Sequence, residues 1–198
     1  ALMCGRMGID VWEVIDAAKT KPFGFMPFYP GPGLGGHCIP IDPFYLSWKA
    51  KQSNFEARFI ELAGQVNSSM PDYVVSRIAD ALNSVKKPIN GSRVHLFGIA
   101  YKRDVNDMRE SPALDIMELL IRRGATVTYS DMWVPSFDHG GHAMSEVPFE
   151  QALKNNYDCA VIATDHAAFD YARIAAMPLV VDTRNAIKGD VGPNVFKL

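Results

Sequence analysis

The chain has 198 residues, of which 48% are hydrophobic and 21% are charged, as is usual for a globular protein. Its 20 basic and 22 acidic residues leave a formal net charge of −2, which argues against nucleic acid or an anionic membrane as the main partner. No apolar run in the sequence is long enough to span a bilayer, and the first residues show no signal-peptide pattern. The three cysteines, Cys4, Cys38 and Cys159, lie far apart and form no C-x-x-C pair, which predicts a reducing, cytoplasmic setting.

Residues 1–19 carry apolar side chains at helical spacing, and Gly8 predicts a break after which Asp10 caps a second short helix. The chain begins inside this apolar run with neither a methionine nor a capping residue, so we expect it to be a piece of a longer protein. Residues 20–27 then lead into a loop that is rich in glycine and proline.

This loop, residues 28–43, holds four glycines, four prolines and one cysteine. Such a composition predicts a stiff backbone that a ligand can approach closely. At its end Cys38 could be a nucleophile, although a lone cysteine is more often an inert buried side chain. Asp42 could be a catalytic carboxylate or simply the N-cap of a helix over 42–50, with Pro43 in the first turn.

A second helical region is predicted over residues 55–84, with Asn54 as its cap. Apolar residues recur three or four apart from Phe59 to Leu82, which gives one stripe over about 28 residues, or roughly 42 Å, with a possible kink at Pro71. The stripe could pack on a neighbouring part of the chain or on a second copy in a homodimer. The polar residues 86–91 end this region, so we divide the chain into domains 1–87 and 88–198.

Beyond that boundary, buried strands alternate with helices, which predicts a parallel sheet with helices on both faces. Ligands bind such sheets beyond the carboxyl ends of the strands. We expect strands and helices in the following ranges: strands 93–100, 126–130, 158–164 and 179–182, and helices 113–123, 149–155 and 169–177.

Cationic residues follow two of these strands. The first strand is followed by Lys102, Arg103 and Arg109 instead of a G-x-G-x-x-G motif, and Arg184 follows the last strand. A helix N-terminus at Ser111 lies just beyond the first group, and cations beside a helix N-terminus suit a phosphate. The same residues could equally form a solvated loop balanced by neighbouring carboxylates.

Two other patterns are weak. His139-Gly140-Gly141-His142 has too few neighbouring ligands for a typical zinc site, so we expect no metal. His37 adjoins Cys38 in sequence, and adjacent residues do not easily form the nucleophile–base pair of a cysteine hydrolase.

Four motifs occur in order along the chain: Gly33-Leu34-Gly35-Gly36-His37-Cys38-Ile39-Pro40-Ile41-Asp42, Ala100-Tyr101-Lys102, Asp107-Met108-Arg109-Glu110-Ser111-Pro112 and Asp182-Thr183-Arg184-Asn185. Together they resemble the UDP-glucose/GDP-mannose dehydrogenase family of NAD-dependent nucleotide-sugar 6-dehydrogenases, over essentially the whole chain. The resemblance implies an α/β fold, in which a helical linker and dimerisation segment precedes a Rossmann-like, parallel-sheet UDP-binding domain. The loop from Pro22 to Cys38 looks most like the branch that acts on UDP-N-acetylhexosamines, with UDP-glucose as the alternative substrate.

The same resemblance implies roles for individual residues. Cys38 would capture the C6 aldehyde of the sugar as a thiohemiacetal that is oxidised to a thioester and hydrolysed, and Asp42 would assist near the thiol or the water. Arg109 would reach the NAD pyrophosphate, and Cys38 to Ile41 would border the nicotinamide. The UDP-sugar would be bound by residues from three segments: Phe28, Tyr29, Gly31, Gly33, Leu34 and Gly35 of the loop, Tyr101 and Lys102, and Arg184.

The chain also departs from the family pattern. Ile41 stands where many UDP-glucose enzymes have a lysine, which favours the N-acetylhexosamine branch. The family's NAD domain, with its glycine fingerprint, and the lysine and asparagine of its central helix have no counterpart in the sequence. We therefore expect a C-terminal part that pairs as a homodimer through residues 55–84 and is inactive by itself. The alternative is a non-catalytic module that binds UDP-sugar and dimerises.

Overall fold

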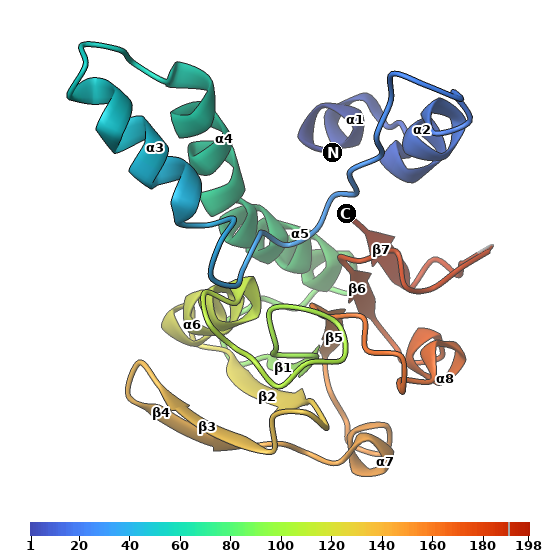
Figure 1. The fold of residues 1–198 in the computed structure, drawn as a ribbon. Helices are drawn as coiled ribbons and strands as arrows, with labels where there is room; N and C mark the ends of the chain where they lie inside the picture. Colours follow the sequence, from blue (N-terminus) through green and yellow to red (C-terminus); the bar gives the residue numbers. More distant parts are fainter. Residues whose placement is uncertain (190) are drawn as a thin grey trace.

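The computed structural model describes residues 1–189 and 191–198, in which helical arms rise from an α/β body (Figure 1). One arm contains α1 (Leu2–Met7) and α2 (Val11–Ala18). Gly8 ends α1 with a left-handed φ of 67°, and the Asp10 carboxylate accepts a hydrogen bond of 2.8 Å from the Trp12 N–H at the start of α2. The predicted break and cap are therefore confirmed. None of the helices that the structure describes is long and apolar enough to cross a membrane.

The region predicted as helical over 55–84 is interrupted at the possible kink near Pro71, and its predicted cap is wrong. It is divided at Ser69 into α4 (Arg58–Ser68) and α5 (Met70–Ser84), because Pro71 occupies the first turn of α5, where its missing N–H costs no hydrogen bond. Asn54 does not cap it: with a φ of 57°, Asn54 donates its N–H to the Lys51 carbonyl and belongs to the turn that follows α3 (Asp42–Lys51).

Asp42 is also misassigned as an N-cap. Ile41 holds the N-cap position of α3, and Asp42 is the first helical residue, with no capping hydrogen bond in the described chain. A carboxylate in the first turn still favours the helix through its dipole. The helices α3 and α4 form a hairpin in which the buried Ser47 hydroxyl donates to the Glu61 carboxylate at 2.8 Å.

Within the described residues, a five-stranded parallel sheet has the order β2-β1-β5-β6-β7. Its strands confirm the expected alternation and add β7: β1 (Arg93–Phe97), β2 (Thr126–Ser130), β5 (Cys159–Ile162), β6 (Val180–Asp182) and β7 (Val195–Lys197). Of the helices between them, α6 (Pro112–Arg122) is displaced by one residue from its expected range, whereas α7 (Phe149–Ala152) and α8 (Tyr171–Ala175) are shorter than expected. Residues 136–145 form an antiparallel hairpin that was not predicted, β3 (Ser136–His139) with β4 (His142–Ser145).

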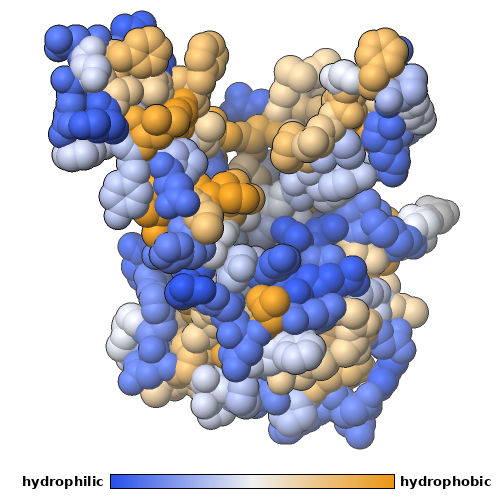
Figure 2. All heavy atoms as spheres, in the orientation of Figure 1, coloured by the Kyte–Doolittle hydropathy of each residue, from blue (hydrophilic) through white to orange (hydrophobic). Residues whose placement is uncertain are grey.

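The apolar stripe is buried on α5 and exposed on α4. On α5, residues such as Val74, Ile78 and Leu82 are fully buried against the sheet and α6, so this half packs within the chain. On α4, Phe59, at 88% exposure, and Leu62, at 55%, remain open to solvent. Figure 2 shows hydrophobic side chains gathered on the helical arms above a more polar body. The α4 half is thus free to meet a partner.

Candidate functional site

The strand order reverses between β1 and β5, because the chain leaves β1 toward β2 on one side and continues to β5 on the other. The carboxyl ends of two neighbouring parallel strands with diverging connections form a crevice in which α/β proteins hold ligands. Residues 98–104 follow β1 at this point, residues 163–167 follow β5, and residues 183–185 follow β6.

The glycine-rich loop lies directly on this crevice. A Cβ added to Gly35 would lie 2.7 Å from the Tyr101 Cβ, and one added to Gly31 would lie 2.7 Å from Nη1 of Arg184. The Gly36 N–H donates a 2.8 Å hydrogen bond to the Arg109 carbonyl. Glycine is therefore needed because the loop backbone touches side chains at the strand ends. The predicted site residues of the loop and of the strand ends come together here, although they are far apart in sequence.

Asn67 anchors the loop from the other side. Its Oδ1 accepts a 2.9 Å hydrogen bond from the Leu34 N–H, and it lies in the last turn of α4. The sequence analysis missed this residue because a polar side chain at a helix end resembles any solvated position.

Cys38 lies at the far end of the loop, with its side chain exposed. Its carbonyl accepts hydrogen bonds from the N–H groups of Ile41, at 3.1 Å, and Asp42, at 2.8 Å, so the cysteine sits in the turn that begins α3. The other cysteines differ, since Cys4 and Cys159 are buried, and burial raises the pKa of the Cys159 thiol to about 12. Cys38 is therefore the thiol that a reactant can reach.

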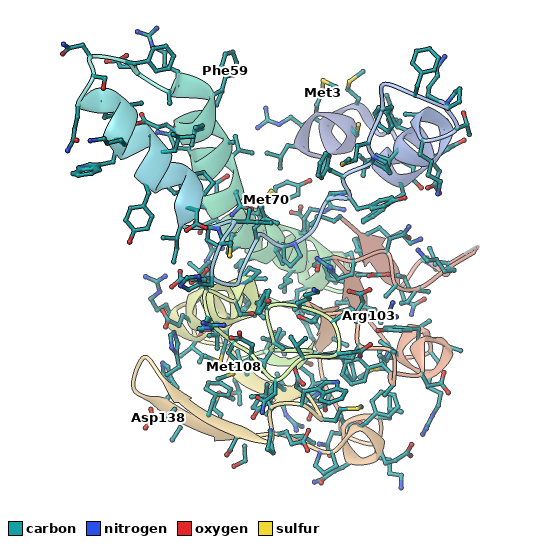
Figure 3. All side chains as sticks on the ribbon, in the orientation of Figure 1. Met3, Phe59, Met70, Arg103, Met108 and Asp138 are labelled. Carbon is teal, nitrogen blue, oxygen red and sulfur yellow. The ribbon has the colours of Figure 1, made fainter. Side chains whose placement is uncertain are left out.

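Charged groups surround the crevice. Asp165 accepts a 3.1 Å hydrogen bond from Nε of Arg184, and its other oxygen lies 4.0 Å from Nε of Arg103. Lys102 directly precedes Arg103 in sequence, is exposed, and forms no ion pair within the described residues. Figure 3 shows Arg103 on the loop between β1 and α6. One carboxylate thus holds two guanidinium groups beside a free ammonium, an arrangement suited to phosphate.

Arg109 lies on the other side of the loop. Its Nη2 pairs with the Asp107 carboxylate at 2.6 Å, and this hydrogen bonding lowers the pKa of Asp107 and raises that of Arg109. Gly36, His37, Ile41 and Arg109 are among the residues that line a shared pocket of about 410 Å³. The predicted cofactor residues Ile41 and Arg109 therefore line one pocket. Cys38 lies in sequence between His37 and Ile41, which both line it.

The predicted substrate residues of the loop share a different pocket. It has a volume of about 780 Å³ and is lined by Phe28, Tyr29, Gly31, Gly33 and Leu34 of the loop and by Arg184. Figure 3 shows Phe59 on α4 and Met3 on α1, which also line it from opposite sides. Gly35 of the loop packs closely against Tyr101, and Lys102, the next residue, is exposed.

Histidines 139 and 142 are paired across the turn of the β3–β4 hairpin. Nε2 of His139 lies 3.6 Å from Oε1 of Glu118. Within residues 1–189 and 191–198, no group of three or more His, Cys, Asp or Glu side chains is placed to hold a metal ion. Both histidines lie on this hairpin, and His139 also lines the pocket that contains Ile41 and Arg109.

Four residues of the crevice were missed: Asp131, Thr164, Asp165 and His166. Thr164, Asp165 and His166 directly follow the buried strand β5, and Asp131 directly follows β2. The signal was present, because polar residues immediately after buried strands mark the carboxyl edge of a parallel sheet. Only the residues after β1 and β6 were predicted to belong to the site.

Known proteins share these features. Residues 95–189 match the profile of the UDP-binding domain of the UDP-glucose/GDP-mannose dehydrogenase family, and residues 1–69 match the profile of its central domain. Over 169 residues, 85% of the chain, it is 36% identical to the UDP-N-acetyl-D-mannosamine dehydrogenase of Methanococcus maripaludis and 35% identical to the UDP-N-acetyl-D-glucosamine 6-dehydrogenase of Pseudomonas aeruginosa. The structure of UDP-D-ManNAc dehydrogenase from Pyrococcus horikoshii matches with a TM-score of 0.82 and 26% identity, over 99% of this chain and 46% of that one. The two sequence matches cover 36% and 39% of those relatives, so this chain spans less than half their length.

Proposed function

The chain belongs to the UDP-glucose/GDP-mannose dehydrogenase family, and we propose that it is the substrate-binding and thiol-bearing part of an NAD-dependent nucleotide-sugar 6-dehydrogenase. One observation carries the proposal: the exposed Cys38 ends a loop whose glycines are pressed against Tyr101 and Arg184. A nucleotide sugar held at the strand ends would therefore extend along the loop toward a thiol.

The UDP end would be held at the crevice. Lys102 and Arg184 carry positive charge at the rim, and Arg184 is already oriented by Asp165. Guanidinium and ammonium groups form charge-assisted hydrogen bonds with phosphate oxygens. The loop residues Phe28, Tyr29, Gly31, Gly33, Leu34 and Gly35 would cover the sugar, and Tyr101 would lie beneath it.

Cys38 would then divide a difficult oxidation into two steps. The C6 alcohol loses a hydride and a proton to give the aldehyde, and the Cys38 thiolate adds to that carbonyl to form a thiohemiacetal. Loss of a second hydride from carbon and of the hydroxyl proton gives a thioester, and water releases the uronic acid and the free thiol. Asp42, one helical turn beyond Cys38, would accept the proton from water or from the thiol.

NAD would supply the hydride acceptor in both oxidations. The residues here fit such a group, because the pocket lined by His37, Ile41 and Arg109 adjoins the Cys38 segment and offers a guanidinium to a pyrophosphate. Ile41 would border the nicotinamide, and the exposed Arg109 would exchange its partner Asp107 for the pyrophosphate.

The substrate would be a UDP-N-acetylhexosamine. Ile41 in place of a lysine supports this choice, as do the relatives, which are named for UDP-N-acetylmannosamine and UDP-N-acetylglucosamine. UDP-glucose is the alternative, because the chain also resembles a UDP-glucose dehydrogenase structure from Pyrobaculum islandicum with a TM-score of 0.76 and 26% identity.

The exposed apolar face of α4 would serve homodimerisation. Phe59, Leu62 and Val66 lie on this face, and each is at least 47% exposed. Apolar residues at helical spacing that find no partner within the described chain suit a second helix.

Calorimetry with UDP tests the binding step. We expect the 198-residue chain to bind UDP, Lys102→Ala to abolish detectable binding, and the distant Lys154→Ala to leave binding unchanged. The chain by itself should not produce NADH from UDP-N-acetylglucosamine, and production of NADH would contradict that expectation. Absence of UDP binding would overturn the proposed function.

The second candidate is a non-catalytic module that binds UDP-sugar and dimerises, as its exposed α4 face suggests. The full-length protein distinguishes the two. A dehydrogenase should reduce NAD with one member of a UDP-sugar panel and should lose acid formation in Cys38→Ser. A Cys38→Ser protein with full activity would rule out the thioester mechanism.

A further inference from the structure

We propose that Asp131 and His166, two buried residues just beyond the carboxyl ends of β2 and β5, are positioning residues. They hold the loop carrying Tyr101, Lys102 and Arg103 in its ligand-binding shape. The inference rests on the proposed UDP site, because it concerns how that site is kept in order. Neither residue is exposed to solvent, and neither is required by the chemistry described above.

Asp131 holds the beginning of the loop. Its Oδ2 accepts hydrogen bonds from the N–H groups of Ile99, at 2.8 Å, and Ala100, at 3.0 Å, and from Nε2 of His166, at 2.9 Å. Burial would raise the pKa of Asp131, but the hydrogen bonds from His166 and the two backbone groups outweigh it, so the pKa lies below its usual value. The carboxylate is therefore anionic, and it satisfies two backbone donors that would otherwise be buried without a partner.

His166 holds the end of the same loop. Its Nδ1 accepts a 2.9 Å hydrogen bond from the Asp104 N–H, which assigns the ring proton to Nε2 and so makes Nε2 the donor to Asp131. One neutral imidazole thus connects both ends of the loop. Asp104 has a left-handed φ of 58°, and the Ala167 N–H donates to its carboxylate at 2.8 Å. A strained residue held from both sides is typical of a functional loop.

Residues after β5 also fix the beginning of the loop. The Thr164 hydroxyl donates to the Ala100 carbonyl at 2.6 Å, and a Cβ on Gly98 would lie 2.5 Å from the Thr164 carbonyl. The residues between the anchors, Tyr101, Lys102 and Arg103, remain partly or fully exposed. The loop therefore has fixed ends and a central part that faces solvent. Ordering these residues before a ligand arrives removes an entropic cost from binding.

Two substitutions at His166 separate positioning from simple stability. Glutamine has one amide donor and one carbonyl acceptor, so His166→Gln can retain both hydrogen bonds, whereas His166→Phe fills similar space and retains neither. In calorimetry well below the unfolding temperature, we expect His166→Phe to weaken UDP binding about tenfold or more, and His166→Gln to stay within about threefold of the unsubstituted chain.

Val127→Ala is the matched control. Val127 lies on β2, the strand that precedes Asp131, and is buried in the core. This variant should therefore unfold at a lower temperature yet bind UDP normally. A His166→Phe chain with unchanged UDP affinity would overturn the inference, as would a Val127→Ala chain weakened to the same degree. If His166→Phe fails to fold, Asp131→Asn replaces it, since an amide side chain has one oxygen that accepts hydrogen bonds whereas the carboxylate has two.

Amide hydrogen exchange keeps this test separate from the proposed function. A chain that binds no UDP would refute the UDP site. The hydrogen bonds that fix the ends of the loop could still be measured through the exchange rates of the Ala100 and Asp104 amides. We expect exchange at both amides to be about tenfold faster in His166→Phe than in Val127→Ala. Equal exchange rates in the two variants would refute the positioning role.

Discussion

Gly36 lies directly on the ring of Tyr101: a Cβ added to the glycine would be 2.7 Å from Cε2 of the tyrosine. The glycine also has a φ of 90°, a conformation that other residues rarely adopt. The same peptide donates its N–H to the Arg109 carbonyl at 2.8 Å. The segment before Cys38 is therefore seated on the loop after β1, and the proposed thiol and UDP positions have a fixed relationship.

Gly36→Ala should weaken UDP binding roughly tenfold, equivalent to about 1.4 kcal/mol, because the methyl group pushes Tyr101 out of place. Gly24→Ala is the control: Gly24 also has a positive φ, of 75°, but has no atom within 4 Å of an added Cβ. Both variants should lose about 1–3 kcal/mol of unfolding free energy from backbone strain. Calorimetry with UDP distinguishes them, and equal affinities would show that the contact with Tyr101 is not needed.

Arg184→Lys should also weaken UDP binding by roughly tenfold. Lysine keeps the charge but loses the planar fork, including the Nε group that Asp165 orients at 3.1 Å. Arg173→Lys is a matched control, since Arg173 pairs with Glu150 on the surface and should leave affinity unchanged. Normal affinity in Arg184→Lys would mean that charge alone, without orientation, suffices at this position.

Thiol labelling should distinguish the cysteines. In the folded chain, iodoacetamide should modify the exposed Cys38, while Cys4 and Cys159 are protected by burial, and the raised pKa of Cys159 protects it further. All three should react in denaturant, as mass spectrometry of tryptic peptides will show. Cys38→Ser should remove labelling of the folded chain, and modification of Cys159 under native conditions would contradict the packing of β5.

The free energy of unfolding should fall as the pH is lowered from about 6.5 toward 3, because His95 takes up a proton in the unfolded chain. Its ring lies between the hydroxyls of Thr128, at 2.8 Å, and Ser130, at 2.9 Å, and burial lowers its pKa to about 3. The unfolded chain binds a proton in this range and the folded chain does not. Acid therefore favours unfolding, by up to about 1.4 kcal/mol per pH unit.

Urea unfolding between pH 7 and 5 measures this slope. His95→Asn should flatten it, whereas His142→Asn, at the hairpin turn, should retain it. An unchanged slope in His95→Asn would assign the acid sensitivity to other groups.

Much of the fold followed from the sequence. The sheet strands β1, β5 and β6 were predicted because short, mainly apolar runs bounded by turn residues are characteristic of strands buried on both faces, whereas β2 alternates threonine with Val127 and Tyr129. β7 and the β3–β4 hairpin were missed because they are three or four residues long and carry no such run. The division at Ser69 agrees with the possible kink at Pro71, but one helical region was predicted instead of two helices because the apolar spacing continues across it.

The site was predictable only where its residues lie in recognisable motifs. Cys38 and Arg184 follow from the glycine-rich loop and the end of β6. Asp131 and His166 carry the weaker signal of polar residues after buried strands, and their 2.9 Å contact depends on β2 and β5 lying on either side of β1, an arrangement that no short motif encodes.

The loop of residues 28–41 contains no helix or strand, and it is held through distant partners, among them Asn67 and Arg109. These contacts require that α4, which carries Asn67, and the segment after β1, which carries Arg109, are already in place. We therefore expect the loop to form late in folding and to detach first when the native state opens locally. A mutation that merely loosens the core could then abolish thiol chemistry while the chain still looks folded by circular dichroism.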